Sequence, residues 1–359
     1  MIITKQKHFL FFFVHPSKYY LFRNTVNTLK KQGHIVDIVI VTKDILEDLI
    51  RKEGWEYTNI FPEGRRSKSK KAYSIIWKTG INFFRTVYRL YKYCHGKKYD
   101  LFITDDCLTV IGWLKRVKSI MFIDDDIGAI PENKLLYLFA YKIISPTNTN
   151  LGKFNSKKIP VKSYKELASL HPDYFTPDIK IVKSFNPELD PYVIIRLVAL
   201  TASHDRNKKG INDKQLLKLI DLLKAKYKIF ISSEKALMPD FEEYQLRVRP
   251  EEIAHVLYYS EMYIGDSQTM SSEAALLGIP AIRCNDFVGK ITVMDEKEYL
   301  YGILRNFKPA EFDKLYETVQ IFINTEGLKQ EWRARRDNML LQMEDINIFL
   351  VKLFTSETL

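Results

Sequence analysis

The alternation of short apolar runs with helical segments is the feature that most constrains how this chain can fold. In the first half, HFLFFFV (8–14), IVDIVIV (35–41), the short WEYTNIF (55–61), YDLFITD (99–105) and SIMFID (119–124) each precede a stretch with helical periodicity. Parallel strands must be joined by a long crossover, which is usually a helix. The alternation therefore predicts β–α–β units with right-handed crossovers in a parallel sheet.

A second series of the same kind begins at VIIRLVAL (193–200) and continues through EMYIGD (261–266) and PAIRC (280–284). Between the two series, residues 151–190 contain several prolines and no long periodic pattern. The length of 359 residues also exceeds one ordinary domain of roughly 150 residues. We therefore predict an α/β protein with two Rossmann-like, doubly wound parallel-sheet domains that face a cleft.

The predicted domain boundaries follow the two series. The first domain covers 1–160, an inter-domain connection covers 161–190, and the second domain covers 191–335. The remaining residues, 336–359, form a terminal helix that can pack back on the first domain. In open parallel sheets, ligands bind beyond the carboxyl ends of the strands, so the functional residues are expected there.

Positive charge is concentrated in the first half of the chain. Residues 1–150 contain 25 Lys and Arg against 14 Asp and Glu, whereas the remainder contains 30 of each. Within the first half, 63–98 contains eleven basic residues and one acidic residue, Glu63. Such a patch attracts phosphate, whether it belongs to a nucleotide, an anionic lipid or a nucleic acid.

Residues 73–94 lie inside this basic region. Apolar residues recur there at helical spacing, and Lys78, Arg85, Arg89 and Lys92 form a second stripe. A wide apolar and aromatic face beside a basic face predicts a helix that lies on an anionic membrane surface. The alternative is an ordinary domain helix with a solvated basic face. Nucleic acid is not expected as a partner, because no nucleic-acid motif accompanies the charge.

The sequence favours a cytoplasmic location, with peripheral attachment to the inner face of the membrane through 73–94. Cys94, Cys107 and Cys284 are scattered without metal-type spacing, which fits a reducing compartment. The apolar run 8–14 is too short to cross a bilayer, and no small-residue cleavage site follows it.

Hydrogen-bonding side chains gather between EMYIGD and the helix predicted over 271–277. A helix N-terminus presents unpaired N–H groups and a partial positive charge, so it favours anions. The hydroxyls of Ser267, Thr269 and Ser271 add donors for phosphate oxygens. Glu273 can accept hydrogen bonds from two vicinal hydroxyls, such as those of a ribose. The simpler alternative is an N-capping serine followed by an ordinary helix residue.

The segment GDSQTMSSEAALLGIPAIRCNDFVG resembles the nucleotide-binding segment of hydrolysing UDP-N-acetylglucosamine 2-epimerases and their glycosyltransferase-B relatives. The preceding RPEEIAHVLYYSEMYIGD fits the same pattern. More closely, SYKELASLHPDYFTPD (163–178), ASHDRNKKGI (202–211) and IGDSQTM resemble an uncharacterised bacterial family of that superfamily, found with polysaccharide loci. The resemblance implies the glycosyltransferase-B fold, with a nucleotide-sugar held mainly by the second domain.

The resemblance also implies roles for single residues. Ser267 matches a serine on the diphosphate, Glu273 a glutamate on the ribose, and His204 a histidine near the diphosphate. Asp105 matches an aspartate after the fourth strand, Asp124 falls where the epimerases have glutamate, and Glu132 loosely matches a further catalytic acid. With the strand-end residues, the candidate substrate-binding set is His204, Arg206, Ser233, Arg249, Ser267, Gln268, Thr269 and Glu273.

The first strand departs from the epimerases, which have an Arg-Pro-Glu element where this chain has His15-Pro16-Ser17. In many inverting glycosyltransferases of this fold, a histidine there is the general base and an aspartate orients it. His15 with Asp105 or Asp106 is the predicted pair, because imidazole titrates near neutrality and a carboxylate can fix its tautomer. The alternatives are a turn histidine beside a proline and an Asp106 that caps the helix predicted over 108–117.

These observations lead to one expected activity. It is an inverting, metal-independent glycosyltransferase that uses a UDP-sugar, such as a UDP-N-acetylhexosamine, to make a surface polysaccharide or a glycolipid on a lipid-linked or glycan acceptor. The catalytic residues would be His15, Asp105, Asp106 and Asp124, with no cofactor. Asp124, Asp125 and Asp126 could instead bind a divalent cation, although the superfamily usually works without metal. A 2-epimerase-like enzyme and a non-catalytic nucleotide-sugar-binding protein remain alternatives.

Overall fold

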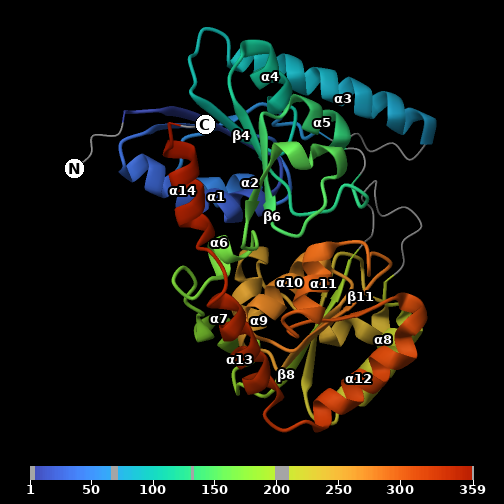
Figure 1. Ribbon diagram of the computed structural model, residues 1–359. Helices are drawn as coiled ribbons and strands as arrows, with labels where there is room; N and C mark the ends of the chain where they lie inside the picture. Colours follow the sequence, from blue (N-terminus) through green and yellow to red (C-terminus); the bar gives the residue numbers. More distant parts are fainter. Residues whose placement is uncertain (1–4, 66–71, 131–132, 199–209, 358–359) are drawn as a thin grey trace. The chain divides into compact units, whose positions relative to one another are not determined.

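The computed structural model describes residues 5–65, 72–130, 133–198 and 210–357. The chain divides into two compact units, which we call unit 1 (1–169 with 344–359) and unit 2 (170–343), and Figure 1 shows their helices and strands. In the described parts of the chain, no helix is both long enough and apolar enough to cross a membrane.

The sheet of unit 1 is parallel, and its seven described strands have the order β3-β2-β1-β4-β5-β6-β7. In chain order these are β1 (His8–Phe13), β2 (Ile35–Ile40), β3 (Thr58–Asn59), β4 (Leu101–Thr104), β5 (Ser119–Phe122), β6 (Lys142–Pro146) and β7 (Lys158–Val161). The helices are α1 (Pro16–Lys31), α2 (Leu46–Lys52), α3 (Ala72–Tyr93), α4 (Leu108–Lys115), α5 (Lys134–Phe139) and α14 (Ile346–Thr355), and α6 (Leu167–Leu170) lies at the unit boundary.

Successive residues of β1 belong to two different cores, because side chains alternate across a strand. Phe11 and Phe13 pack with residues of α1, α2 and α14, whereas Leu10 and Phe12 pack with residues of α3 and α4. Figure 1 shows the same division, with α3, α4 and α5 on one face of the sheet and α1, α2 and α14 on the other. Burial on both faces explains why the strand reads HFLFFF without polar alternation.

Unit 2 contains a second parallel sheet, whose described strands have the order β12-β11-β10-β8-β9. They are β8 (Tyr192–Leu197), β9 (Lys228–Ser233), β10 (Met262–Gly265), β11 (Ala281–Cys284) and β12 (Arg305–Phe307). The helices are α7 (Ile179–Lys183), α8 (Asp213–Leu223), α9 (Ile253–Tyr259), α10 (Gln268–Leu276), α11 (Thr292–Tyr299), α12 (Phe312–Asn324) and α13 (Leu328–Leu340).

The prediction of two parallel-sheet α/β domains is confirmed, with local differences. The helix predicted from residue 271 begins at Gln268, because the Ser267 side chain caps it by accepting a hydrogen bond from the Met270 N–H. The strand predicted over WEYTNIF is reduced to β3, which pairs only with the end of β2. The segment 161–190, predicted to be irregular, contains α6 and α7.

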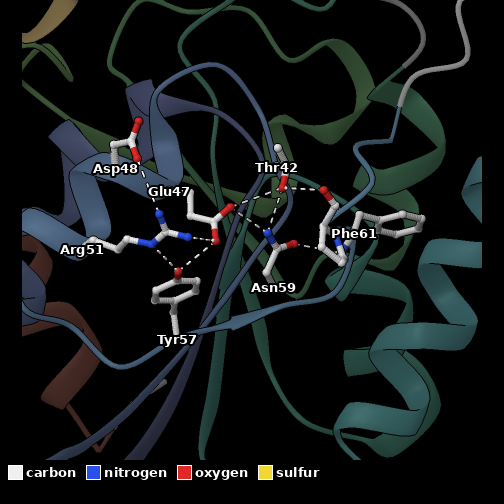
Figure 2. A network of polar contacts seen from close by, with 8 residues as sticks. Thr42, Glu47, Asp48, Arg51, Tyr57, Asn59 and Phe61 are labelled. Atoms are coloured by element: carbon white, nitrogen blue, oxygen red, sulfur yellow. Dashed lines mark hydrogen bonds and ion pairs between the residues drawn. The ribbon is translucent and has the colours of Figure 1, made fainter.

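A polar network joins α2 to the carboxyl ends of β2 and β3 (Figure 2). One oxygen of Glu47 accepts hydrogen bonds from Tyr57 Oη at 2.8 Å and Arg51 Nη2 at 2.9 Å. Its other oxygen accepts from Asn59 Nδ2 at 3.0 Å and Thr42 Oγ1 at 3.3 Å. The hydrogen bond from Tyr57 is the main cause that lowers the pKa of Glu47. Glu47 is therefore the centre of the β2–α2–β3 crossover.

Replacing Glu47 by alanine should lower the free energy of unfolding by about 1–3 kcal/mol, because four donors lose their shared acceptor. The pKa of Glu47 is depressed in the folded state, so the contribution should be present above the unfolded pKa of about 4.3 and lost as the pH falls through the folded pKa. Asp48→Ala is the matched control, since Asp48 lies in the same helical turn, is 69% exposed and, within the described ranges, forms one ion pair, with Arg51 at 3.8 Å. Urea unfolding at neutral and acidic pH measures both variants, and equal losses would contradict the account.

Candidate functional site

His15 follows β1 and caps the N-terminus of α1. Its Nδ1 accepts a hydrogen bond from the Ser17 backbone N–H at 3.2 Å and lies 3.1 Å from the Ser17 hydroxyl. Although the ring is exposed, desolvation by the surrounding protein and the charge of Lys43 lower the pKa of His15 to about 4. The ring is therefore neutral near pH 7, with its proton on Nε2, and Nε2 has no lone pair to accept another.

The two carboxylates after β4 have different partners. Lys18, in the first turn of α1, places its ammonium 3.3 Å from Asp105 Oδ2 and 3.1 Å from the Phe122 carbonyl oxygen, to which it donates. Arg65 donates to both oxygens of Asp106, each at 2.8 Å. Lys18 and Arg65, rather than His15, are thus the side-chain partners of these carboxylates among the described residues, and the pairing of His15 with Asp105 or Asp106 stays a prediction. Cys107, rather than Asp106, stands at the N-cap position of α4.

Burial acts on both carboxylates, and their partners decide the outcome. Desolvation raises the pKa of Asp105, since the single ammonium of Lys18 only partly offsets it. Burial also opposes ionisation of Asp106, but Arg65 outweighs it and holds the pKa of Asp106 below its usual range. Asp105 Oδ1 is buried without a hydrogen-bond partner among the described residues. Neighbouring carboxyl groups with separated pKa values are typical of acid–base sites.

The three aspartates after β5, Asp124, Asp125 and Asp126, also have different surroundings. Lys165 binds Asp124 at 2.6 Å, and this carboxylate raises the pKa of Lys165 although burial alone would lower it. Asp126 is buried and accepts a hydrogen bond from the Asn150 N–H at 2.7 Å. For Asp125, desolvation and the neighbouring charge of Asp124 raise the pKa to about 6. Asp125 therefore titrates close to neutrality.

The hydroxyl-rich turn of unit 2 forms the N-terminus of α10. Ser267 caps the helix through its bond from the Met270 N–H at 3.3 Å, and the Ser271 hydroxyl donates to the Ser267 carbonyl oxygen at 2.6 Å. Gln268 Oε1 accepts a hydrogen bond from Arg283 Nη1 at 3.3 Å. Thr269 is exposed, and Glu273 is half-buried in the second turn of α10. Ser267 is thus an N-capping serine, as the simpler alternative to a phosphate-binding role predicted.

Arg283 was not among the predicted residues. It lies on β11 beneath this turn with its side chain fully buried, and burial lowers its pKa to about 10. Its Nε and Nη2 have no hydrogen-bond partner within the described chain. Because the guanidinium remains charged at neutral pH, it adds positive potential near the N-terminus of α10.

A pocket of about 890 Å³ opens at the strand ends of unit 2. Its lining includes Val198 after β8, Ser233 at the end of β9, Asp266 after β10 and the start of α8 at Asn212. The Ser233 hydroxyl donates to the Lys235 carbonyl oxygen at 2.8 Å and shapes the turn there. A volume of this order suits a small organic ligand.

Asp266 is the buried carboxyl of this pocket, with an exposed fraction of 4%. One oxygen accepts a hydrogen bond from the Val198 N–H at 2.8 Å. Desolvation raises its pKa to about 7. The carboxyl group therefore changes charge near neutrality inside the pocket.

The remaining predicted residues lie elsewhere. Arg249 is 65% exposed and pairs with Glu252 in a surface capping box. His204 and Arg206 lie outside the described residues, as does Glu132. Within the described ranges, no group of three His, Cys, Asp or Glu side chains is arranged to hold a metal ion.

Sequence reasoning missed the cations that organise unit 1. Arg65, Lys18 and Lys165 each neutralise a strand-end aspartate, but they come from a loop, a helix and a segment far along the chain. For Lys18, the position in the sequence could have predicted this role. The residue lies in the first helical turn after a strand, where its side chain can reach the carboxyl edge of the sheet.

Comparison with solved structures supports the fold. The calicheamicin glycosyltransferase CalG4 matches with a TM-score of 0.60 and 10% identity over 98% of both chains. A putative UDP-N-acetylglucosamine 2-epimerase from Listeria monocytogenes matches with a TM-score of 0.67 and 11% identity over 98% of this chain and 97% of that one. The UDP-GlcNAc 2-epimerase from Neisseria meningitidis, bound to UDP-GlcNAc, matches with a TM-score of 0.65 and 13% identity over 97% of this chain and all of that one.

At these identities the likeness shows the fold, which is that of glycosyltransferase-B proteins, and no reaction. No curated protein matches the sequence. The predicted membership of an uncharacterised family of this superfamily is confirmed by a family model that matches residues 15–347. The chain belongs to the family described as "Protein of unknown function (DUF354)".

Proposed function

We propose that the chain is an enzyme that transfers a glycosyl group from a nucleoside-diphosphate sugar, with Asp125 as the general base. The observation that carries this proposal is the pKa of Asp125, which is about 6. Burial and the charge of Asp124 raise this pKa, and the cations Lys165 and Lys18 partly oppose the rise. A base of this pKa is mostly ionised at neutral pH and can still accept a proton, which is the balance that general-base catalysis needs.

The proposal replaces His15 by Asp125 as the base. His15 keeps a structural role, since its Nδ1 caps α1 and its pKa near 4 makes it a weak base. In the proposed reaction, Asp125 removes the proton of the acceptor hydroxyl while that oxygen attacks the anomeric carbon and the nucleoside diphosphate leaves. The acceptor would be a lipid-linked or glycan hydroxyl, in the synthesis of a surface polysaccharide or a glycolipid.

Unit 2 is proposed to bind the nucleoside diphosphate. The Ser267 hydroxyl accepts the capping bond with a lone pair, so its own hydrogen can still donate to a phosphate oxygen. The helix N-terminus and the buried charge of Arg283 favour the diphosphate. Glu273, one turn further along α10, is assigned to the ribose hydroxyls of a uridine nucleotide.

A second candidate is a 2-epimerase-like reaction on UDP-N-acetylglucosamine. The observation that favours it is the pair of buried carboxyls after β4, since burial raises the pKa of Asp105 while Arg65 holds the pKa of Asp106 below its usual range. An epimerase needs several acids and bases around one sugar, whereas a transferase needs one base. Incubation with UDP-N-acetylglucosamine alone separates the two, because free N-acetylmannosamine with UDP indicates the epimerase and a product that forms only with an acceptor indicates the transferase.

Asp125→Asn should lower turnover by about 10²- to 10⁴-fold, the usual range for general acid–base catalysis. The parent rate should rise with pH and level off above an apparent pKa of about 6, because the base must be ionised. Asp44→Asn is the control, since it removes one carboxylate from unit 1 at a site that is 52% exposed. If Asp125→Asn keeps both the parent rate and the parent pH profile, Asp125 is not the base.

Glu273→Ala should weaken UDP binding about tenfold or more, because hydrogen bonds to charged groups contribute roughly 1.5–3 kcal/mol. Pyrophosphate lacks a ribose, so its binding should change little. Glu317→Ala, on the exposed surface of α12, is the control for removing a carboxylate from unit 2. Titration calorimetry of the parent and of both variants with each ligand measures these affinities, and unchanged UDP affinity in Glu273→Ala would leave Glu273 as a helix residue without a role in binding.

A further inference from the structure

Helix α3 has two apolar faces. Its inner face packs in the core through Leu90, while Ile81, Phe84, Tyr88 and Tyr91 form an outer stripe with exposed fractions of 52%, 71%, 67% and 46%. The spacing of three, four and three residues places these four side chains on one side of the helix. A helix on a domain surface needs one apolar stripe, so the folding of unit 1 does not account for the second.

The neighbouring helices extend this stripe. Helix α4 contacts both α3 and α5, and Figure 1 shows the three on the same face of the sheet. Trp113 and Leu114 on α4 are 62% and 50% exposed, and Leu135 and Leu138 on α5 are 49% and 54% exposed. We call the combined surface the outer face of unit 1; it comprises Ile81, Phe84, Tyr88, Tyr91, Trp113, Leu114, Leu135 and Leu138.

Basic residues surround the outer face, and acidic residues are missing from its segments. Residues 72–98, 107–123 and 133–150 contain no Asp or Glu. Lys92, Arg116, Lys118 and Lys134 are exposed, and Lys115 holds its ammonium 5.7 Å from the centre of the Tyr91 ring. Glu63, from the preceding loop, pairs with Arg85 and Arg89 and neutralises only part of this charge.

A groove of about 630 Å³ borders the outer face where α4 and α5 end. It is lined by Trp113 and Tyr141 together with Arg116 and Lys118. A fifth residue, Lys157, donates to three carbonyl oxygens around the end of α5 and so is already engaged. Aromatic rings beside free cations are the combination found where proteins meet lipid headgroups.

We propose that the outer face docks on the surface of an anionic lipid bilayer, with its aromatic and aliphatic side chains at the headgroup boundary and its basic residues among the headgroups. A nucleic acid would match the charge but would leave the aliphatic side chains in water. A second copy of this chain would cover them but would oppose two basic surfaces, which repel each other. An anionic membrane matches both features.

The placement also fits an enzyme that keeps its site open. Tyr91 and Trp113 lie in the last turns of α3 and α4, which lead into the amino ends of β4 and β5. Asp105 and Asp125 follow the carboxyl ends of the same strands. Tyr91 and Trp113 therefore lie toward the opposite ends of these strands from the carboxylate group. The docking proposal stands independently of the proposed reaction, because membrane binding needs no nucleotide.

Vesicle co-sedimentation of the full chain tests the proposal, using phosphatidylcholine vesicles with and without phosphatidylglycerol. Binding should require the anionic lipid and should weaken as salt is raised. Phe84→Ser/Tyr88→Ser/Trp113→Ser should weaken it about tenfold or more, and Arg116→Gln/Lys118→Gln about fivefold for each charge removed. Tyr299→Ser/Leu300→Ser in unit 2, where the side chains are 80% and 63% exposed, should bind like the parent.

Three results would overturn the proposal. One is equal or negligible binding to both kinds of vesicle. Another is binding that the triple serine variant retains in full while circular dichroism shows an intact fold. The third is a parent protein that ignores vesicles but dimerises, or binds an RNA or DNA oligonucleotide, in a way that the triple variant loses.

Discussion

The ammonium of Lys18 is the contact on which the candidate site of unit 1 depends. It joins three elements of unit 1. Lys18 belongs to α1, forms an ion pair with Asp105 after β4 and donates a hydrogen bond to the carbonyl oxygen of Phe122 at the end of β5. A buried cation is unfavourable unless it is paired and hydrogen-bonded. Its two partners therefore fix where the first turn of α1 meets the carboxyl edge of the sheet.

From this contact follows the unequal chemistry of the surrounding carboxylates. Asp105 and Asp106 each have a cationic partner, but the bidentate guanidinium of Arg65 holds the pKa of Asp106 below its usual range, whereas burial outweighs the ammonium of Lys18 and raises the pKa of Asp105. Lys165 pairs with Asp124, and burial together with the neighbouring carboxylate of Asp124 raises the pKa of Asp125 to about 6. One short stretch of sheet edge thus carries carboxyl groups whose pKa values are shifted in opposite directions.

Much of the fold could be predicted because it depends on local patterns. Apolar runs that alternate with helical periodicity mark buried parallel strands, and the runs 8–14 and 35–41 contain β1 and β2. The short β3 was harder to predict, since an edge strand has one neighbour and little apolar content. The location of the site at the strand ends was also accessible, because parallel topology brings those ends to one edge.

The pairings within the site were not accessible from sequence. Asp124 and Lys165 are distant in the chain, and only the folded sheet brings them to 2.6 Å. For His15 the competing partner is local, because the backbone N–H of Ser17 donates to the Nδ1 that would otherwise face an orienting aspartate. Spacing and residue type identify which residues lie at the carboxyl edge of the sheet, whereas tertiary contacts decide which residue each of them pairs with.

The turnover of a His15→Asn variant tests most directly whether the acid–base chemistry of unit 1 resides in its carboxylates. Asparagine is a favourable N-cap residue, so the variant should keep α1 and Lys18 in place. The asparagine side chain cannot act as a base. The variant should turn over within a few-fold of the parent rate and keep the parent pH profile. A loss of about 10²-fold or more, with the fold intact, would contradict it and return the base to His15.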